Sequence, residues 1–211
     1  MTHVAFLRAI NVGGRAVVKM TDLKAAFERA GCSRVQTFIA SGNVLFDAPA
    51  RLPPVLRQRI ATELVTLLGM EPGICYRTLG EIEALIEAAP FGALVSDRAL
   101  KLYVAFMDRV PARVPKLPVL VEKERLEIIA IRAADVLIVS RRKPNGMYGF
   151  PNACVEAIGV VATSRNWNTV TRVAAFARQA RSAMRRCADP AEPAPARPGR
   201  GARAGIRSRA S

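Results

Sequence analysis

The order in which strand-like and helix-like segments alternate constrains this chain more than any single motif. The expected segments of the first half are a strand at 3–10, a helix at 21–30, strands at 34–40 and 43–46, a helix from Pro53-Pro54 to about residue 68, and a strand at 73–78. Thr21 is placed to cap the first helix, and Gly31 and Gly69 are placed to end the two helices. Gly42 supplies the turn of a hairpin. Strand, helix, hairpin, helix and strand make up a split β-α-β unit.

The second half repeats this order. Its expected segments are strands at 101–107, 126–132, 136–140 and 160–163, a short helix at 151–159, a closing helix from 167 to about 184, and one helical candidate at 117–123. A short helix at about 80–88 joins the two halves. We therefore predict an α+β protein, a tandem duplication of two ferredoxin-like (split β-α-β) sandwich subdomains at residues 1–95 and 96–186. A single continuous mixed sheet is the alternative.

The end of the chain differs in composition from the rest. Nineteen of the 25 residues at 187–211 are Ala, Arg, Pro or Gly, and Ile206 is the only large aliphatic side chain. Such a segment buries too little apolar surface to offset its backbone entropy, so we predict a disordered basic tail. The tail also explains much of the +15 net charge, because residues 178–211 carry +7 and residues 1–177 carry +8.

Histidine and cysteine usage limits the possible chemistry. His3 is the single histidine, and the four cysteines, at 32, 75, 154 and 187, lack the close spacing of a metal or redox motif. We expect no metal and no cofactor. Arg8 interrupts the first apolar run too early for a signal peptide, and no run approaches the roughly 18 apolar residues of a membrane span. These features predict a cytoplasmic protein that does not enter a membrane.

Three segments carry a family resemblance. They are AFLRAINVGG at 5–14, SGNVLF at 41–46 and ATSRNWNTV at 162–170. Together they resemble the bacterial family known as domain of unknown function 1697, over about residues 3–178. Ala9 departs from this pattern, because members of the family usually have glycine there. The resemblance implies a fold of two ferredoxin-like subdomains and implies no activity.

The first candidate site follows the first strand. A glycine-containing loop after a strand can hold an anion on its backbone N–H groups, and an arginine beside it can pair with the same anion. A tight turn is the alternative explanation for the glycines. The candidate ligand-binding residues here are Arg8, Asn11, Gly13 and Gly14.

The second candidate site precedes the closing helix and contains Arg165, Asn166 and Asn168. An arginine and an amide at a helix N-terminus suit a carboxylate, a phosphate or a nucleobase. In the structural alternative, Asn166 caps the helix and Trp167 packs across the sheet. That alternative leaves Arg165 and Asn168 without a structural task. In the second resembling segment, Ser41-Gly42-Asn43 is best explained as hairpin turn chemistry.

Two hypotheses about function follow. In the first, the protein binds a phosphate-bearing ligand, a nucleotide or nucleic acid, because residues 96–177 still carry +6. The alternative is an enzyme that acts on a small anionic metabolite between the two halves, using Arg8, Asn11, Arg165 and Asn168. No catalytic residue is assigned, since no Ser or Cys lies in a nucleophile motif and the carboxylates, Glu156 included, form no paired motif. A scaffold for a protein partner is a third possibility.

Overall fold

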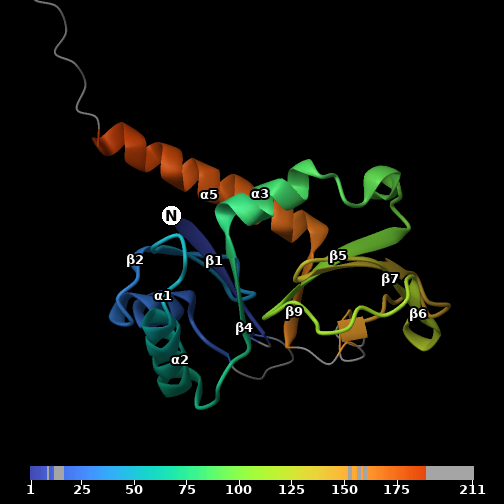
Figure 1. Ribbon diagram of the computed structural model, residues 1–211, viewed down its shortest axis with the longest axis horizontal. Helices are drawn as coiled ribbons and strands as arrows, with labels where there is room; N and C mark the ends of the chain where they lie inside the picture. The colour runs from blue at the N-terminus through green and yellow to red at the C-terminus, as the bar shows by residue number, and fades with distance from the viewer. Residues whose placement is uncertain (9, 12–16, 152–153, 156–157, 159–160, 189–211) are drawn as a thin grey trace, which may run out of the picture.

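The computed structural model describes residues 1–8, 10–11, 17–151, 154–155, 158 and 161–188 (Figure 1). The described part is a mixed α/β protein with two antiparallel sheets and four α-helices. The elements of the first half are β1 (Thr2–Leu7), α1 (Met20–Arg29), β2 (Ser33–Phe38), β3 (Asn43–Asp47), α2 (Pro54–Leu68), β4 (Ile74–Thr78) and α3 (Leu79–Glu87). Those of the second half are η1 (Gly92–Ser96), β5 (Leu100–Met107), β6 (Val119–Val121), η2 (Glu122–Glu124), β7 (Leu126–Arg132), β8 (Asp135–Arg141), β9 (Ala162–Asn166) and α5 (Trp167–Ala188).

The two sheets have matching strand orders and matching registers. The first runs β2-β3-β1-β4 and the second runs β6-β7-β8-β5-β9. In the first sheet, Phe6 pairs with Asn43 on one side and Cys75 on the other. In the second sheet, Phe106 pairs with the residues at the equivalent positions, Asp135 on one side and Thr163 on the other. The first strand of each half therefore lies between the second strand of its hairpin and the last strand of the half.

Local signals explain where the helices begin and end. Helix α2 begins at Pro54, and Gly69 ends it in the left-handed region at φ 69°. Helix α3 begins with a capping box, in which the Thr78 hydroxyl accepts from the Glu81 N–H and the Glu81 carboxylate accepts from the Thr78 N–H. Sequence alone predicted these four α-helices and the first hairpin to within a few residues.

Three predictions about elements are wrong. Helix α1 begins one residue before Thr21, and its N-cap residue is Lys19. The segment at 117–123 is not a helix, because β6 pairs there with β7 at the edge of the sheet, where Pro118 can precede the strand without loss of a ladder bond. The last strand, β9, continues to Asn166 rather than ending at 163, so Arg165 lies in the sheet.

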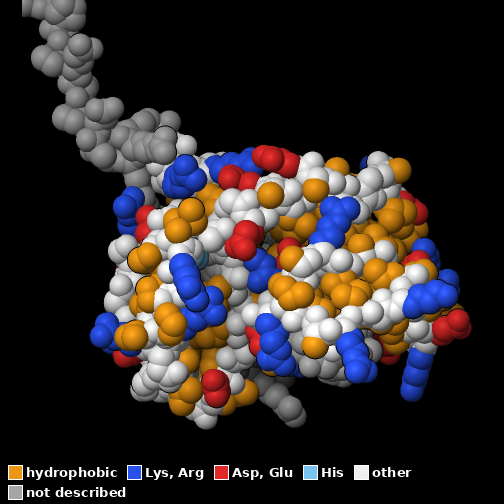
Figure 2. All heavy atoms as spheres, in the orientation of Figure 1, with side chains coloured by type: hydrophobic (Ala, Val, Ile, Leu, Met, Phe, Trp, Pro, Cys, Tyr) orange, Lys and Arg blue, Asp and Glu red, His pale blue; other side chains and the backbone are white. Residues whose placement is uncertain are grey.

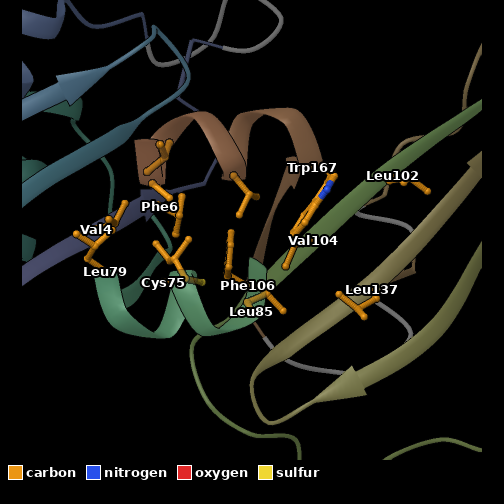
Figure 3. Packing of buried hydrophobic residues seen from close by; sticks show 14 of the residues in the cluster. Val4, Phe6, Cys75, Leu79, Leu85, Leu102, Val104, Phe106, Leu137 and Trp167 are labelled. Carbon is orange, nitrogen blue, oxygen red and sulfur yellow. The ribbon is translucent and has the colours of Figure 1, made fainter. Parts of the chain in front are cut away.

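One hydrophobic core joins the two halves. Helices α3 and α5 lie on the same side of both sheets (Figure 1), and the core beneath them takes residues from β1, β4, β5 and β8. At its centre the rings of Phe6 and Phe106 stack with centroids 4.1 Å apart. Figure 3 shows these two rings between α3 and α5. Two further cores lie under α1 and α2 and on the second sheet.

The closing helix is longer than expected. It continues to Ala188, two residues into the segment predicted to be disordered. The rest of that tail, 189–211, lies outside the described residues, as does most of the short helix expected at 151–159. Within the described part, no helix combines the length and apolar character needed to cross a bilayer.

Candidate functional site

Arg165 joins the three resembling segments. It projects from β9 into the junction between the halves and is 8% exposed. Its guanidinium lies over the ring of Phe6, 5.6 Å from the centroid. Its N–H groups donate to six protein acceptors: Asn43 Oδ1 at 2.6 Å, Thr163 Oγ1 at 2.8 Å, and the carbonyls of Leu7 (2.8 Å), Ser41 (2.8 Å), Gly42 (3.2 Å) and Ser164 (3.0 Å).

These contacts give Arg165 the structural task that sequence reasoning did not find. Among its partners there is no carboxylate in the described part of the chain. Burial lowers the pKa of Arg165 to about 10, which still leaves the side chain charged at neutral pH. Since five guanidinium N–H groups are all donated within the protein, this arginine holds β1 and the β2-β3 turn against β9.

Arg77 occupies the equivalent position in the first half. Arg77 pairs with Val4 across β4 and β1, as Arg165 pairs with Val104 across β9 and β5. Arg77 is also 8% exposed, and it lies 5.3 Å from the centroid of Phe106. It donates to Asp135 Oδ1 at 2.9 and 2.7 Å and to the carbonyls of Tyr76 (2.7 Å), Met107 (3.1 Å) and Ala134 (2.7 Å).

Asn11 and Arg8 of the first candidate site have different contacts within the protein. The Asn11 amide accepts from the Val18 N–H at 2.8 Å and donates to the Val18 and Ala40 carbonyls, so it holds the loop to the hairpin turn. Arg8 lies beyond the end of β1, where its backbone N–H donates to the Gly73 carbonyl at 2.8 Å. Gly13 and Gly14 lie outside the described residues.

Asn166 and Asn168 lie together at the start of α5. Asn166 Oδ1 accepts from the Asn168 N–H at 2.9 Å, which is the helix-capping contact that the structural alternative predicted. Both residues also line a pocket of about 360 Å³, which we call the α5 pocket. Its lining consists of Val95, Asp97, Arg98, Leu100, Lys101, Leu102, Tyr148, Asn166, Trp167 and Asn168.

Two cations and an aromatic ring give the α5 pocket its character. Arg98 and Lys101 are exposed, and the Lys101 ammonium lies 4.4 Å from the centroid of the Tyr148 ring. Asp97, the one carboxylate among the described lining residues, accepts from the Ala99 N–H at 2.8 Å. The partial positive charge of the helix N-terminus adds to the two cations. This arrangement can bind an anion.

Sequence reasoning missed Arg98, Lys101 and Tyr148. Arg98 and Lys101 lie on either side of the start of β5, and Tyr148 lies in a loop that forms an isolated bridge with Arg142. No motif connects these residues in the sequence. The only available signal was the excess of cations in residues 96–177, which includes Arg98 and Lys101.

The described cysteines are not poised for nucleophilic chemistry. Cys32, Cys75 and Cys154 are buried and free, and burial raises the pKa of each thiol to about 11. Thiols with such values are almost fully protonated at neutral pH. In the part of the chain that the structure describes, no three His, Cys, Asp or Glu side chains are grouped to hold a metal ion.

Comparison with known proteins finds one family. The model of the family described as "Protein of unknown function (DUF1697)" matches residues 1–136. A solved structure, that of the conserved bacterial protein SP0830 from Streptococcus pneumoniae, is similar with a TM-score of 0.54 and 18% identity, over 82% of this chain and 96% of that one. The similarity extends the shared fold well past residue 136. No curated protein matches the sequence.

Proposed function

Since this chain belongs to the DUF1697 family of proteins of unknown function, whose name assigns no activity, we propose a function from its own geometry. The protein binds a phosphate-bearing ligand, a nucleotide or nucleic acid, in the α5 pocket. One observation carries the proposal: Arg98, Lys101 and the N-terminus of α5 converge on a pocket of about 360 Å³. That volume lies in the range of small-molecule sites. The pocket includes Asn166 and Asn168 from the sequence-predicted ligand set.

An enzyme acting on a small anionic metabolite is the second candidate. In its favour, a pocket of about 510 Å³ between the halves is lined by Arg8, Met70, Glu71, Pro72 and Gly73 of the first half and by Val161 of the second. Only Arg8 of the four residues predicted for this enzyme lines that pocket. Asn168 lines the α5 pocket, and the side chains of Asn11 and Arg165 are bonded within the protein. The geometry therefore supports the binding function better.

The proposal includes the origin and the setting of the protein. We infer that residues 1–95 and 96–186 are duplicated ferredoxin-like subdomains. The matched registers around Phe6 and Phe106 and the matched positions of Arg77 and Arg165 support this inference. We place the protein in the cytoplasm, where free buried thiols such as Cys75 stay reduced. For the tail beyond Ala188, at 189–211, disorder stays a prediction.

A ligand-dependent thermal shift tests the proposed function. Binding to the native state raises the melting temperature, so millimolar adenosine monophosphate, inorganic phosphate and a short oligonucleotide are compared on the full chain. We expect at least one of them to raise it, and the double variant Arg98→Gln with Lys101→Gln to lose the rise. The control removes the same charge elsewhere, at the exposed Arg113 and Lys116. No shift with any phosphate compound refutes the proposal.

A further inference from the structure

The two equivalent helices, α3 and α5, begin differently. Helix α3 follows the strand that carries Arg77, and α5 follows the strand that carries Arg165. Glu81 and Thr169 are equivalent, because each is the third residue of its helix. In α3 the Glu81 carboxylate lies at the helix N-terminus, where it accepts from the Thr78 N–H at 2.7 Å. In α5 a neutral threonine takes the place of this carboxylate. The first half therefore supplies its own anion at a position where the second half has none.

A largely buried tryptophan faces the same place in the second half. Trp167 is 8% exposed and lines the α5 pocket, and its ring packs edge-on against Phe91 with centroids 5.2 Å apart. Throughout the described residues, its indole Nε1–H donates to no protein acceptor. Figure 3 shows the indole nitrogen turned toward Leu102, another lining residue, and away from Phe106. Among the described residues the indole nitrogen is not one of the fully buried polar atoms that lack a partner, so it is open to the pocket and can donate to a ligand.

We propose that the α5 pocket binds the terminal phosphate of a small phosphomonoester, such as a nucleoside monophosphate. This inference rests on the proposed function and specifies its ligand. The phosphate takes the place that the Glu81 carboxylate has on α3, and it accepts from the Trp167 indole and the first-turn amides of α5. Lys101 and Arg98, which line the same pocket, neutralise its charge.

The form of the pocket favours a monoester over a nucleic acid backbone. A terminal phosphate presents three free oxygens and ends the molecule, which suits donors that converge from an indole, a helix end and two cations. A phosphodiester has two free oxygens, and its chain must enter and leave the site. Figure 2 shows the Lys and Arg side chains of one face scattered among hydrophobic ones, without the continuous basic stripe along which a strand binds.

Trp167 provides the measurement, because it is the only tryptophan in the chain. Its fluorescence is titrated on the full chain with adenosine monophosphate, inorganic phosphate, adenosine, and an oligonucleotide that has hydroxyl groups at both ends. We expect the first two compounds to change the emission and the last two to leave it unchanged. Calorimetry with Trp167→Phe, which keeps a ring and removes the N–H, should show binding of the monophosphate weakened by about tenfold, the loss of one charged hydrogen bond.

The variant Thr169→Glu places a carboxylate at the position of Glu81 in α3. It should fill the anion position from within and weaken monophosphate binding by about tenfold or more, while the Asn166 cap keeps α5 folded. Ala175→Glu adds the same charge to an exposed position of the same helix and should bind normally. Circular dichroism of both variants checks that they are folded.

The outcomes separate this inference from the proposed function. If the oligonucleotide changes the Trp167 emission as strongly as the monophosphate, the pocket binds phosphate but the monoester inference is wrong. If the monophosphate binds and neither Thr169→Glu nor Trp167→Phe weakens it, the assigned anion position is wrong. If no phosphate compound binds, the proposed function and this inference both fail.

Discussion

Arg77 and Arg165 hold the two halves together by the same geometry with different electrostatics. Each lies on the last strand of its half, reaches across to the other half, and covers a phenylalanine of the stacked pair. Each donates to the carbonyl that ends the opposite first strand, Met107 for Arg77 and Leu7 for Arg165. The side chain that accepts the Nε–H differs, since Arg77 meets the Asp135 carboxylate.

Arg165 meets the neutral amide of Asn43 at the matching place. The difference shows that each junction uses the several N–H donors of one guanidinium, and that a carboxylate partner for that guanidinium is not required. Carbonyl dipoles satisfy the Arg165 guanidinium, and burial is the main influence on its pKa. At the Arg77 junction, burial affects the carboxylate instead: it raises the pKa of Asp135, although the charge of Arg77 opposes this rise.

Removing the charged partner of a carboxylate should have the largest effect. Arg77→Met leaves Asp135 buried without its cation and should lower the free energy of unfolding by about 4 kcal/mol. Chemical denaturation measures the loss, and Arg109→Met, at an exposed arginine, is the control. A loss no larger than that of the control would show that Asp135 does not depend on Arg77.

Removing the arginine without a carboxylate should cost less. Arg165→Met should lower the unfolding free energy by about 2–3 kcal/mol, because buried carbonyls lose their donor while the desolvation of the cation is relieved. The same denaturation series measures it beside Arg77→Met. If Arg165→Met is the more damaging variant, the hydrogen bonds to Leu7 and Gly42 matter more than the ion pair does.

Asp135→Asn converts the first junction into a copy of the second and should cost about 1 kcal/mol at neutral pH. The pH dependence gives a second test. Because the folded-state pKa of Asp135 is raised above its ordinary 3.8, its contribution to stability is full below that value and is lost as pH rises through the raised pKa. The stability of the native sequence relative to Asp135→Asn should therefore fall as pH increases from 3 toward neutrality. A pH-independent difference would contradict the assignment.

An exposed contact between the same two halves should have the smallest effect. Arg178 on α5 donates to Glu83 on α3 at 2.6 Å, with side chains 54% and 25% exposed. Glu83→Gln should change the unfolding free energy by about 0.5 kcal/mol or less, because solvent screens such pairs. A thermal melt in low and high salt measures it. An effect as large as that of Arg165→Met would mean that surface charge, not the buried arginines, joins the halves.

Features set by neighbouring residues were predictable from the sequence. The glycine that ends α2, the proline that begins it and the Asn166 cap act over a few residues, so pattern alone located them. The resemblance to the DUF1697 family came from three short segments, and the family match covers two of them.

Features set by distant residues were not predictable. Arg165 was interpreted as a ligand-binding residue because its structural partners, Asn43 and Leu7, lie 122 and 158 positions away. The α5 pocket depends in the same way on Lys101 and Tyr148, which the fold brings beside Asn168. No periodicity or spacing in a single sequence predicts contacts between residues so far apart.

The bond from Arg165 to the Leu7 carbonyl has a consequence for synthesis on the ribosome. The two residues are 158 positions apart, and chains grow at about 5–20 residues per second. The end of β1 must therefore wait on the order of 10–30 s for its last partner to be made. Until residue 106 has been made, Phe6 lacks its stacking partner Phe106, and until residue 165 has been made it also lacks the Arg165 guanidinium. The nascent first half therefore presents an apolar surface to chaperones during synthesis.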